Sequence, residues 1–473
     1  MGKTLIKGGA VVTATETTEA DVVVENGKVV AILARGGAGF DVTADHVIDA
    51  TGKYVMPGGI DVHTHMELPF GGTSAADTFE TGTRAAAWGG TTTIVDFAVQ
   101  TKGESAMEGF EKWMAKAEGN TAIDYGFHMI TGDINEQTLK EMQMLMDEGV
   151  TSFKMFMAYP GVFYSDDGEI LRAMQKGAEI GATICMHAEN GIAIDVLVEQ
   201  ALSRGETDPI YHGIVRKSIL EGEATHRAIK LAQLTGVPLY IVHLSAQEAL
   251  DEVIQARDQG LNVFAETCPQ YLFLSLENLG NGFDGAKYVC SPPLRDAKAG
   301  HQERLWKGLR TNDLQVVSTD HCPFCMGDHP QFGTQKQLGR DDFSKIPNGM
   351  PGVEPRFELM YNGGVAEGRL SLNRFVEIVA TTPARMFGMY PQKGTIAVGS
   401  DADIVVFDPK ARTTISVDTH HMAVDYSAYE GWELTGKVET VLSKGKVLID
   451  NDEYHGSPGD GQFLRRGTNQ YLI

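Results

Sequence analysis

Cysteine and basic residues are both scarce in this sequence of 473 residues. The five cysteines are odd in number and scattered, which excludes the dense disulfide framework of small secreted domains. Lysine and arginine total 40 against 63 aspartates and glutamates, giving a formal net charge of −23. Because such an acidic surface repels phosphate backbones and anionic lipids, neither nucleic acid nor a membrane is an expected partner.

Long hydrophobic runs are also missing. No uninterrupted apolar stretch reaches the roughly 18 residues that a membrane helix needs. The first residues, M-G-K-T-L-I-K, have no apolar signal core, which favours a cytoplasmic protein. Hydrophobic residues at 42% and charged residues at 22% are typical of a globular protein. The length suits an α/β barrel of roughly 250 residues with a smaller attached domain.

Short apolar runs at both ends of the chain predict β-strands. They lie at residues 4–7, 11–14, 21–25, 29–33 and 47–49, and again at 403–408, 413–416, 438–443 and 446–449. Asn26-Gly27, between two of these runs, is a strong hairpin turn signal. Since neither set makes a convincing sheet alone, we expect one small β-sandwich assembled from both termini, with the middle of the chain inserted.

The middle of the chain alternates strand-like and helix-length segments. Eight short β-branched or apolar runs occupy residues 59–62, 92–97, 125–129, 152–156, 183–187, 239–243, 262–266 and 316–319. Segments 136–148 and 247–259 carry apolar residues at helical spacing and are expected on the outside. This alternation predicts a (β/α)₈ barrel. The expected division is residues 1–55 and 391–460 for the β-sandwich, 56–390 for the barrel and 461–473 for a C-terminal tail.

Polar residues gather at the ends of the predicted barrel strands. Residues two apart on a strand share a face, so the histidines of H-T-H can offer their imidazoles to one metal ion. The full set is His63, His65, Lys154, His187, His243 and Asp320. Any one of these histidines could be an ordinary hydrogen-bonded core residue. Six such side chains at strand ends meet on one rim of a barrel, which favours a metal-dependent active site.

Lys154 is the unexpected member of this set, because an ammonium repels a metal ion. It lies in the apolar run S-F-K-M-F-M-A, where desolvation lowers the pKa of a lysine and produces the free amine. A free amine reacts with carbon dioxide to give a carbamate, whose two oxygens can bridge two metal ions. The alternative is a lysine paired with a neighbouring carboxylate.

Several motifs resemble the dihydropyrimidinase and D-hydantoinase family of the amidohydrolase superfamily. They are H-T-H, K-M-F-M-A-Y, M-H-A-E-N-G, I-V-H-L-S, S-T-D-H and I-P-N-G. The resemblance implies a (β/α)₈ barrel with a two-part β-sandwich, and commonly a homotetramer. It implies that His63, His65 and Asp320 hold one divalent metal ion, that His187 and His243 hold a second, and that carboxylated Lys154 bridges them. Zinc is the expected metal, because it suits imidazole and carboxylate ligands.

The resemblance also implies the reaction. A hydroxide bridging two metal ions would open a cyclic amide, converting dihydropyrimidines or 5-substituted hydantoins to N-carbamoyl amino acids. Asp320 would be ligand and acid/base, although His321 could move the proton instead. Tyr159 matches the tyrosine that stabilises the oxyanion, and Ser291 and Asn348 match the positions whose backbone groups bind the imide edge. Ordinary loop packing and turn formation would also account for these three residues.

Two long segments, 268–295 and 322–355, are expected to build the substrate pocket, because loops at the C-terminal face of a barrel usually do so. Candidates for an apolar wall around the ring substituent are Met66, Leu68, Phe70, Phe156 and Phe163. The run C-P-F-C-M-G-D-H-P-Q-F-G departs from the family pattern. Cys322, Cys325 and His329 could form a redox pair or a zinc site, but a closed zinc site needs four ligands.

Three other activities share this fold. Dihydroorotase is disfavoured because it uses an arginine shortly after H-x-H, where this chain has M-E-L-P. Allantoinase, which also opens a hydantoin ring, remains an alternative. The collapsin response mediator proteins are non-enzymatic scaffolds that lack most of the metal ligands. This sequence has every ligand position filled, which disfavours the scaffold alternative.

Overall fold

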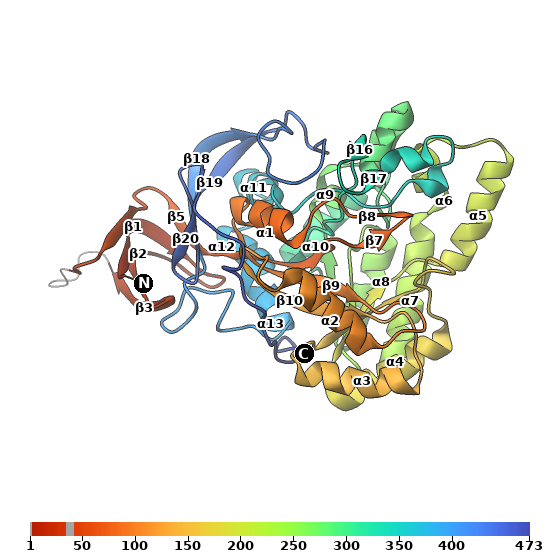
Figure 1. The fold of residues 1–473 in the computed structure, drawn as a ribbon, viewed down its shortest axis with the longest axis horizontal. Coiled ribbons are helices and arrows are strands. Elements are labelled where there is room, and N and C mark those ends of the chain that lie inside the picture. The colour runs from red at the N-terminus through yellow and green to blue at the C-terminus, as the bar shows by residue number, and fades with distance from the viewer. Residues whose placement is uncertain (1, 35–41) are drawn as a thin grey trace.

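The computed structural model describes residues 2–34 and 42–473. It contains a large barrel surrounded by helices and a smaller sheet at one end (Figure 1). Of the expected first segment of the β-sandwich, residues 1 and 35–41 lie outside the described part of the chain. Among the described helices, none combines the length and the apolar character needed to cross a membrane.

Eight parallel strands form the barrel, as predicted. They are β6 (Gly59–Thr64), β9 (Thr91–Val99), β10 (Asp124–Ile130), β11 (Ser152–Phe156), β12 (Thr183–His187), β13 (Leu239–Ile241), β14 (Val263–Thr267) and β15 (Val316–Val317), each paired with its sequence neighbour. A parallel bridge between Thr64 and His321 joins the first strand to the chain after the last. There the amide of His65 donates to the carbonyl of His321 at 2.9 Å. The ring is therefore closed at its C-terminal rim.

Helices connect the strands and cover the outside of the barrel (Figure 1). They are α1 (Phe79–Trp88), α2 (Ala106–Ala117), α3 (Glu136–Asp147), α4 (Asp167–Ile180), α5 (Gly191–Ser203), α6 (Ile210–Val215), α7 (Ser218–Thr235), α8 (Gln247–Asp258) and α10 (His301–Thr311). Helices α3 and α8 confirm the two segments predicted from helical spacing. Local sequence sets their limits: α4 begins with a capping box between Asp166 and Glu169 and ends at Gly181, whose φ is +75°.

Shorter helices complete the chain. They are α9 (Pro269–Phe273), α11 (Arg356–Met360), α12 (Leu372–Val376) and α13 (Thr382–Met386), with wide turns η6 (Tyr361–Ala366) and η7 (Glu377–Thr381) between the last three. Arg356 of α11 is fully buried beneath the barrel, where its guanidinium donates to the carbonyls of Ile60 and Val317. It therefore ties the first and last barrel strands together.

Strands from both termini share one nine-stranded sheet. They are β1 (Thr4–Val12), β2 (Thr17–Glu25), β3 (Lys28–Ala34), β4 (His46–Asp49), β5 (Tyr54–Pro57), β18 (Ile404–Thr414), β19 (Glu433–Ser443), β20 (Lys446–Asp450) and β21 (Glu453–Tyr454). The ends meet where β5 pairs with β18, so red and blue strands lie side by side in Figure 1. Residues of both ends, among them Ile6, Val22 and Ile404, form a separate apolar core. The predicted fold class, a (β/α)₈ barrel with a small β-sandwich domain built from both termini, is confirmed, and the β strands of this domain form one mixed sheet.

A buried lysine connects the two parts. The ammonium of Lys393, whose side chain is 1% exposed, lies 2.6 Å from Asp124 of β10, 2.7 Å from Asp403 and 3.0 Å from Asp401. Burial alone would lower the pKa of Lys393, but the carboxylates of Asp403, Asp124 and Asp401 raise it above its ordinary value. The charge is therefore retained in the folded protein at neutral pH.

Replacing Lys393 with methionine is expected to lower the free energy of unfolding by about 3–5 kcal/mol, because it leaves the buried carboxylate of Asp403 without a cation. Asp124 and Asp401 lose one of their two cations and keep Lys444 and Lys28. Denaturant titration followed by circular dichroism measures this loss. The control is Lys437→Met, which removes a partly exposed lysine paired with Asp452 at 2.7 Å and is expected to cost less than about 1 kcal/mol. Equal losses in the two variants would contradict this assignment.

Candidate active site

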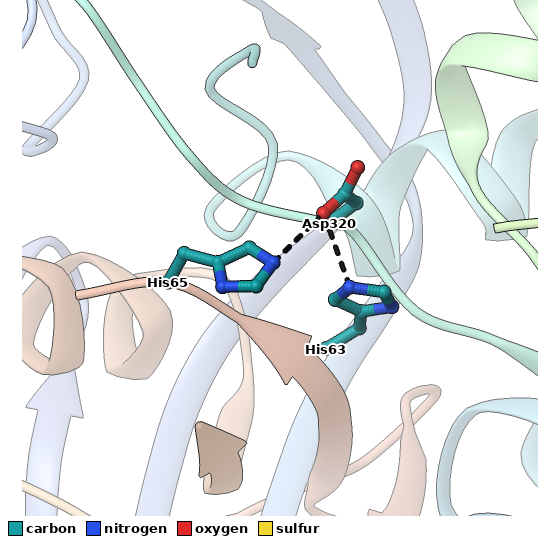
Figure 2. A group of neighbouring side chains, drawn as sticks. All are labelled: His63, His65 and Asp320. Carbon is teal, nitrogen blue, oxygen red and sulfur yellow. Dashed lines mark ion pairs between the residues drawn. The ribbon is translucent and has the colours of Figure 1, made fainter. Parts of the chain in front are cut away.

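Two histidines and an aspartate meet at the closed rim of the barrel. His63 lies near the end of β6, His65 follows that strand, and Asp320 lies three residues beyond β15. The Nε2 atoms of His63 and His65 lie 3.1 and 3.2 Å from Oδ1 of Asp320 (Figure 2). All three side chains are buried, and their potential ligand atoms lie within 4.8 Å of one another. This arrangement can hold one metal ion.

A carboxylate behind the cluster orients His63. Nδ1 of His63 forms a short hydrogen bond with Glu266 of β14, which leaves Nε2 directed at Asp320. Metal-binding histidines typically use such a carboxylate to fix the ring. Burial opposes a charged ring, but Glu266 raises the pKa of His63 above its ordinary value. Glu266 was missed as a functional residue, although it ends a predicted strand just as the ligand candidates do.

His187 and His243 form a second cluster on the same rim. Nδ1 of His187 lies 2.9 Å from Nε2 of His243, and Nε2 of His187 lies 2.8 Å from Glu189. Within the described part of the chain, the buried Nδ1 of His243 has no hydrogen-bond partner. Burial lowers the pKa of both histidines, so both rings are neutral at pH 7. Neutral imidazole is the form that binds metal ions.

Glu189 is a second residue that the sequence analysis missed. Burial alone would raise its pKa, but Arg216, whose guanidinium lies 3.7 Å away, and His187 lower that pKa to about 2. The carboxylate is thus ionised and fixes the orientation of the His187 ring. Its position two residues after a strand-end histidine, in M-H-A-E-N, is the signal that could have found it.

Lys154 lies on β11 between the two clusters, with 1% of its surface exposed. The rings of Phe97 and Phe156 lie 4.7 and 4.9 Å from its Nζ. Over residues 2–34 and 42–473, its ammonium has neither a hydrogen bond nor an ion pair, so the paired-carboxylate alternative finds no partner there. Burial lowers the pKa of Lys154 to about 8. About a tenth of this lysine is therefore a free amine at pH 7, far more than for a lysine of ordinary pKa.

One cavity of about 50 Å³ brings the predicted site residues together, except His63, which does not line it. The strand-end and loop residues that line it are His65, Lys154, Tyr159, His187, His243, Ser291, Asp320 and Asn348. Four expected apolar wall residues, Leu68, Phe70, Phe156 and Phe163, line it as well. The fifth candidate, Met66, does not line the cavity. The carboxylate of Asp96 accepts a hydrogen bond from its amide, and its side chain is buried against Gly82 of α1.

Three loop residues are hydrogen-bonded to one another at the cavity. The side-chain Nδ2 of Asn348 lies 3.1 Å from the Ser291 hydroxyl and 3.3 Å from the Tyr159 hydroxyl. Burial raises the pKa of Tyr159 to about 12, so its phenol remains a proton donor at neutral pH. Tyr159, His243 and Asp320 have φ values of +62°, +40° and +52°. Backbone strain of this kind, at non-glycine residues, is typical of functional sites.

The two long segments reach this cavity, as predicted. Segment 268–295 contains α9 and the turns η1 (Leu276–Gly280) and η2 (Gly282–Tyr288); segment 322–355 contains the hairpin β16 (Asp328–His329) and β17 (Gly333–Thr334) and the turns η4 (Lys336–Gly339) and η5 (Phe343–Lys345). Cys322 and Cys325 are free, buried thiols. Burial raises the pKa of both, which opposes the thiolate that redox or zinc chemistry needs.

His321, beside Asp320, has both ring nitrogens occupied. Its Nε2 donates to Asp77 at 2.9 Å, and its Nδ1 accepts from the amides of Gly352 and Val353 at 3.1 and 3.3 Å. The side chain is fully buried. Because neither ring nitrogen is free, this imidazole has a structural role and holds the chain after β15 in place.

Comparisons with known proteins agree with this geometry. A family model described as the amidohydrolase family matches residues 54–448. A D-hydantoinase from Streptomyces coelicolor is 66% identical over 472 residues, covering 99% of each chain. A D-hydantoinase from Geobacillus stearothermophilus is 49% identical, covering 98% of this chain and 96% of that protein. The crystal structure of a dihydropyrimidinase from Brevibacillus agri has a TM-score of 0.95 at 49% identity, covering 99% of both chains. The chain therefore belongs to the amidohydrolase family, and within it to the dihydropyrimidinases and hydantoinases.

Proposed function

We propose that this cyclic amide hydrolase opens dihydropyrimidines and 5-substituted hydantoins to N-carbamoyl amino acids. The observation that carries the proposal is the single cavity lined by Lys154, three histidines, Asp320 and the loop residues Tyr159, Ser291 and Asn348. Allantoinase is not favoured, because the similar relatives over the whole length of the chain are hydantoinases and dihydropyrimidinases.

The proposed cofactor is a pair of divalent metal ions, with zinc expected from the ligand types. One ion would be held by His63, His65 and Asp320, and the other by His187 and His243. Carboxylated Lys154 would bind both ions. Support comes from the neutral rings of His187 and His243, whose Nδ1 and Nε2 atoms face each other at 2.9 Å, and from the unpaired amine of Lys154. When bound, such ions acidify water and polarise a carbonyl group.

The protein's own groups would handle protons and charge. Burial alone would raise the pKa of Asp320, but His63 and His65 hold that pKa well below its ordinary value, so the carboxylate is ionised and can accept a proton. It would take the proton of the attacking water and deliver it to the ring nitrogen that leaves. The protonated hydroxyl of Tyr159 would donate to the oxyanion that forms on the carbonyl.

The imide edge of the ring would be bound by backbone groups at Ser291 and Asn348. Throughout the described residues, the main-chain N–H and C=O groups of these two residues form no hydrogen bond with protein atoms. Both residues line the cavity. Unpaired main-chain groups at a fixed separation suit the alternating donors and acceptors of an imide.

A larger cavity of about 520 Å³ adjoins the first, sharing Phe70, Tyr159 and Asn348 with it. Its further apolar lining residues are Val162, Val198, Leu338, Phe343 and Ile346. A substituent on the ring carbon can extend into this space, which supports bulky 5-substituted hydantoins as substrates. We propose the D form as the preferred hand, following the D-hydantoinase name of the Streptomyces relative.

A hydrolysis panel tests the proposed function. Dihydrouracil, dihydrothymine, the two hands of a 5-substituted hydantoin, and allantoin are compared by kcat/KM. We expect the D-hydantoin and the dihydropyrimidines to be opened at least about tenfold faster than allantoin, a difference of about 1.4 kcal/mol in transition-state stabilisation. Allantoin as the best substrate would contradict the proposal.

Elemental analysis tests the proposed cofactor. Protein purified without chelator is expected to contain about two divalent metal ions per chain, as the six ligands imply. Dialysis against a chelator should remove both the metal and the activity, and adding zinc should restore them. Full activity in metal-free protein would contradict the proposed chemistry.

The proposal extends to a cytoplasmic homotetramer, which the family resemblance implies. Exposed apolar side chains on α5, Ile192 at 53% and Val196 at 50%, offer surface for contacts between chains. Sedimentation equilibrium is expected to give a mass about four times the 51.3 kDa of one chain. A single-chain mass at micromolar concentration would contradict this assembly.

A further inference from the structure

Lys336, at the start of η4, is a fully buried lysine. Its Nζ donates to three main-chain carbonyls, at 2.8 Å to Pro347, 2.9 Å to Gly349 and 3.1 Å to Val289. An ammonium has three N–H donors, so each has an acceptor. In the described part of the chain no carboxylate pairs with this cation.

The three carbonyls belong to residues next to or near Ser291 and Asn348, the two residues proposed to bind the imide edge. Pro347 and Gly349 are the neighbours of Asn348, and Val289 precedes Ser291 by two residues. The amide of Gly349 also donates to the carbonyl of Val289 at 3.0 Å. One ammonium therefore fixes two segments that are distant in sequence, and with them the separation of the unpaired main-chain groups of Ser291 and Asn348.

Burying a charged side chain at this position costs free energy. Burial lowers the pKa of Lys336 to about 7, whereas the three carbonyl acceptors favour the charged form, which alone has three N–H donors. The titratable groups that face it are the thiols of Cys290 and Cys322, whose pKa values burial raises, and the imidazole of His212, whose pKa burial lowers to about 3, so none of them supplies a negative charge. A well-packed apolar side chain often serves a purely structural position at least as well as a buried charge. The three hydrogen bonds of Lys336 instead hold the segments that contain Ser291 and Asn348 at a fixed separation.

We propose that Lys336 is a positioning residue, which sets the spacing between the main-chain groups of Ser291 and Asn348 and thereby the affinity for the cyclic amide. This inference rests on the proposed function, in which those two segments bind the imide edge. Lys336 does not line the catalytic cavity and acts only through the segments that it holds.

The test compares Lys336→Met, which keeps the approximate side-chain length but removes the donors, with wild type. A matched control is Lys307→Met, at an exposed position on α10. Steady-state kinetics with dihydrouracil, metal content and thermal unfolding are measured for each. We expect KM to rise about tenfold or more in Lys336→Met, with kcat within about threefold and metal content unchanged. Lys336→Gln, whose amide retains two N–H donors, is expected to give an intermediate KM.

A wild-type KM in Lys336→Met would overturn the inference. Joint loss of kcat and metal would do the same, because the lysine would then support the metal site. If neither variant yields folded protein, Lys336 supports the whole fold and the inference is likewise overturned. Failure of the proposed function can be told apart from failure of this inference by testing wild-type protein. If the proposed function is wrong, wild-type protein will open none of the rings in the panel.

Discussion

Lys154→Ala is expected to lose one metal ion per chain and to lower kcat by about 10²-fold or more. The side chain lies between two aromatic rings, and among residues 2–34 and 42–473 no carboxylate is paired with it, so we expect no neighbouring group to replace the bridging oxygens of the proposed carbamate. Elemental analysis and steady-state kinetics on the same preparation measure both effects. Lys140→Ala, an exposed lysine on α3, is the matched control and is expected to behave as wild type.

Short carboxylic acids should partly restore the Lys154→Ala variant. Acetate or propionate can enter the space left by the side chain and supply two oxygens between the metal positions. Lys154→Arg should not be restored, because a guanidinium fills the space and keeps a positive charge. Wild-type turnover and metal content in Lys154→Ala would show that the lysine is not a ligand. Rescue of the arginine variant by acetate would argue against a specific bridging position.

The placement of the strand-end residues could be predicted because a barrel obeys a simple geometric rule. All parallel strands end at one rim, so a polar residue at the end of each run lies near the others. That rule placed His187 and Lys154 in one cavity although they lie on different strands. The same rule applies to Glu266, whose role was missed because its contact with His63 spans 203 residues in sequence.

Other parts of the site depend on contacts that no local pattern encodes. The hydrogen bond between Asp77 and His321 joins residues 244 apart, and Lys336 acts on carbonyls whose residue identity does not matter. The main-chain N–H of Met66 donates a hydrogen bond to the carboxylate of Asp96, and this contact fixes the backbone at Met66. Apolar spacing predicts which face of a strand is buried, but it does not predict how the chain turns after the strand ends.

Asp320→Asn is expected to separate metal binding from proton transfer. An amide oxygen can still coordinate a metal ion weakly, but it cannot accept and return a proton at neutral pH. Turnover should therefore fall by about 10²-fold or more, whereas binding of the ring, set by groups at Ser291 and Asn348, should change far less. Steady-state kinetics measure the first effect. Calorimetric titration with a slowly hydrolysed ring measures the second.

The competing explanation is that Asp320 only holds metal while His321 moves the proton. The structure opposes this, because the two ring nitrogens of His321 are engaged by Asp77 and by the amides of Gly352 and Val353. Excess zinc distinguishes the two explanations. If Asp320 were only a ligand, refilling the site of Asp320→Asn would recover turnover. If it carries the proton, as we expect, the metal-replete variant will remain slow, because the defect lies in proton transfer and not in occupancy.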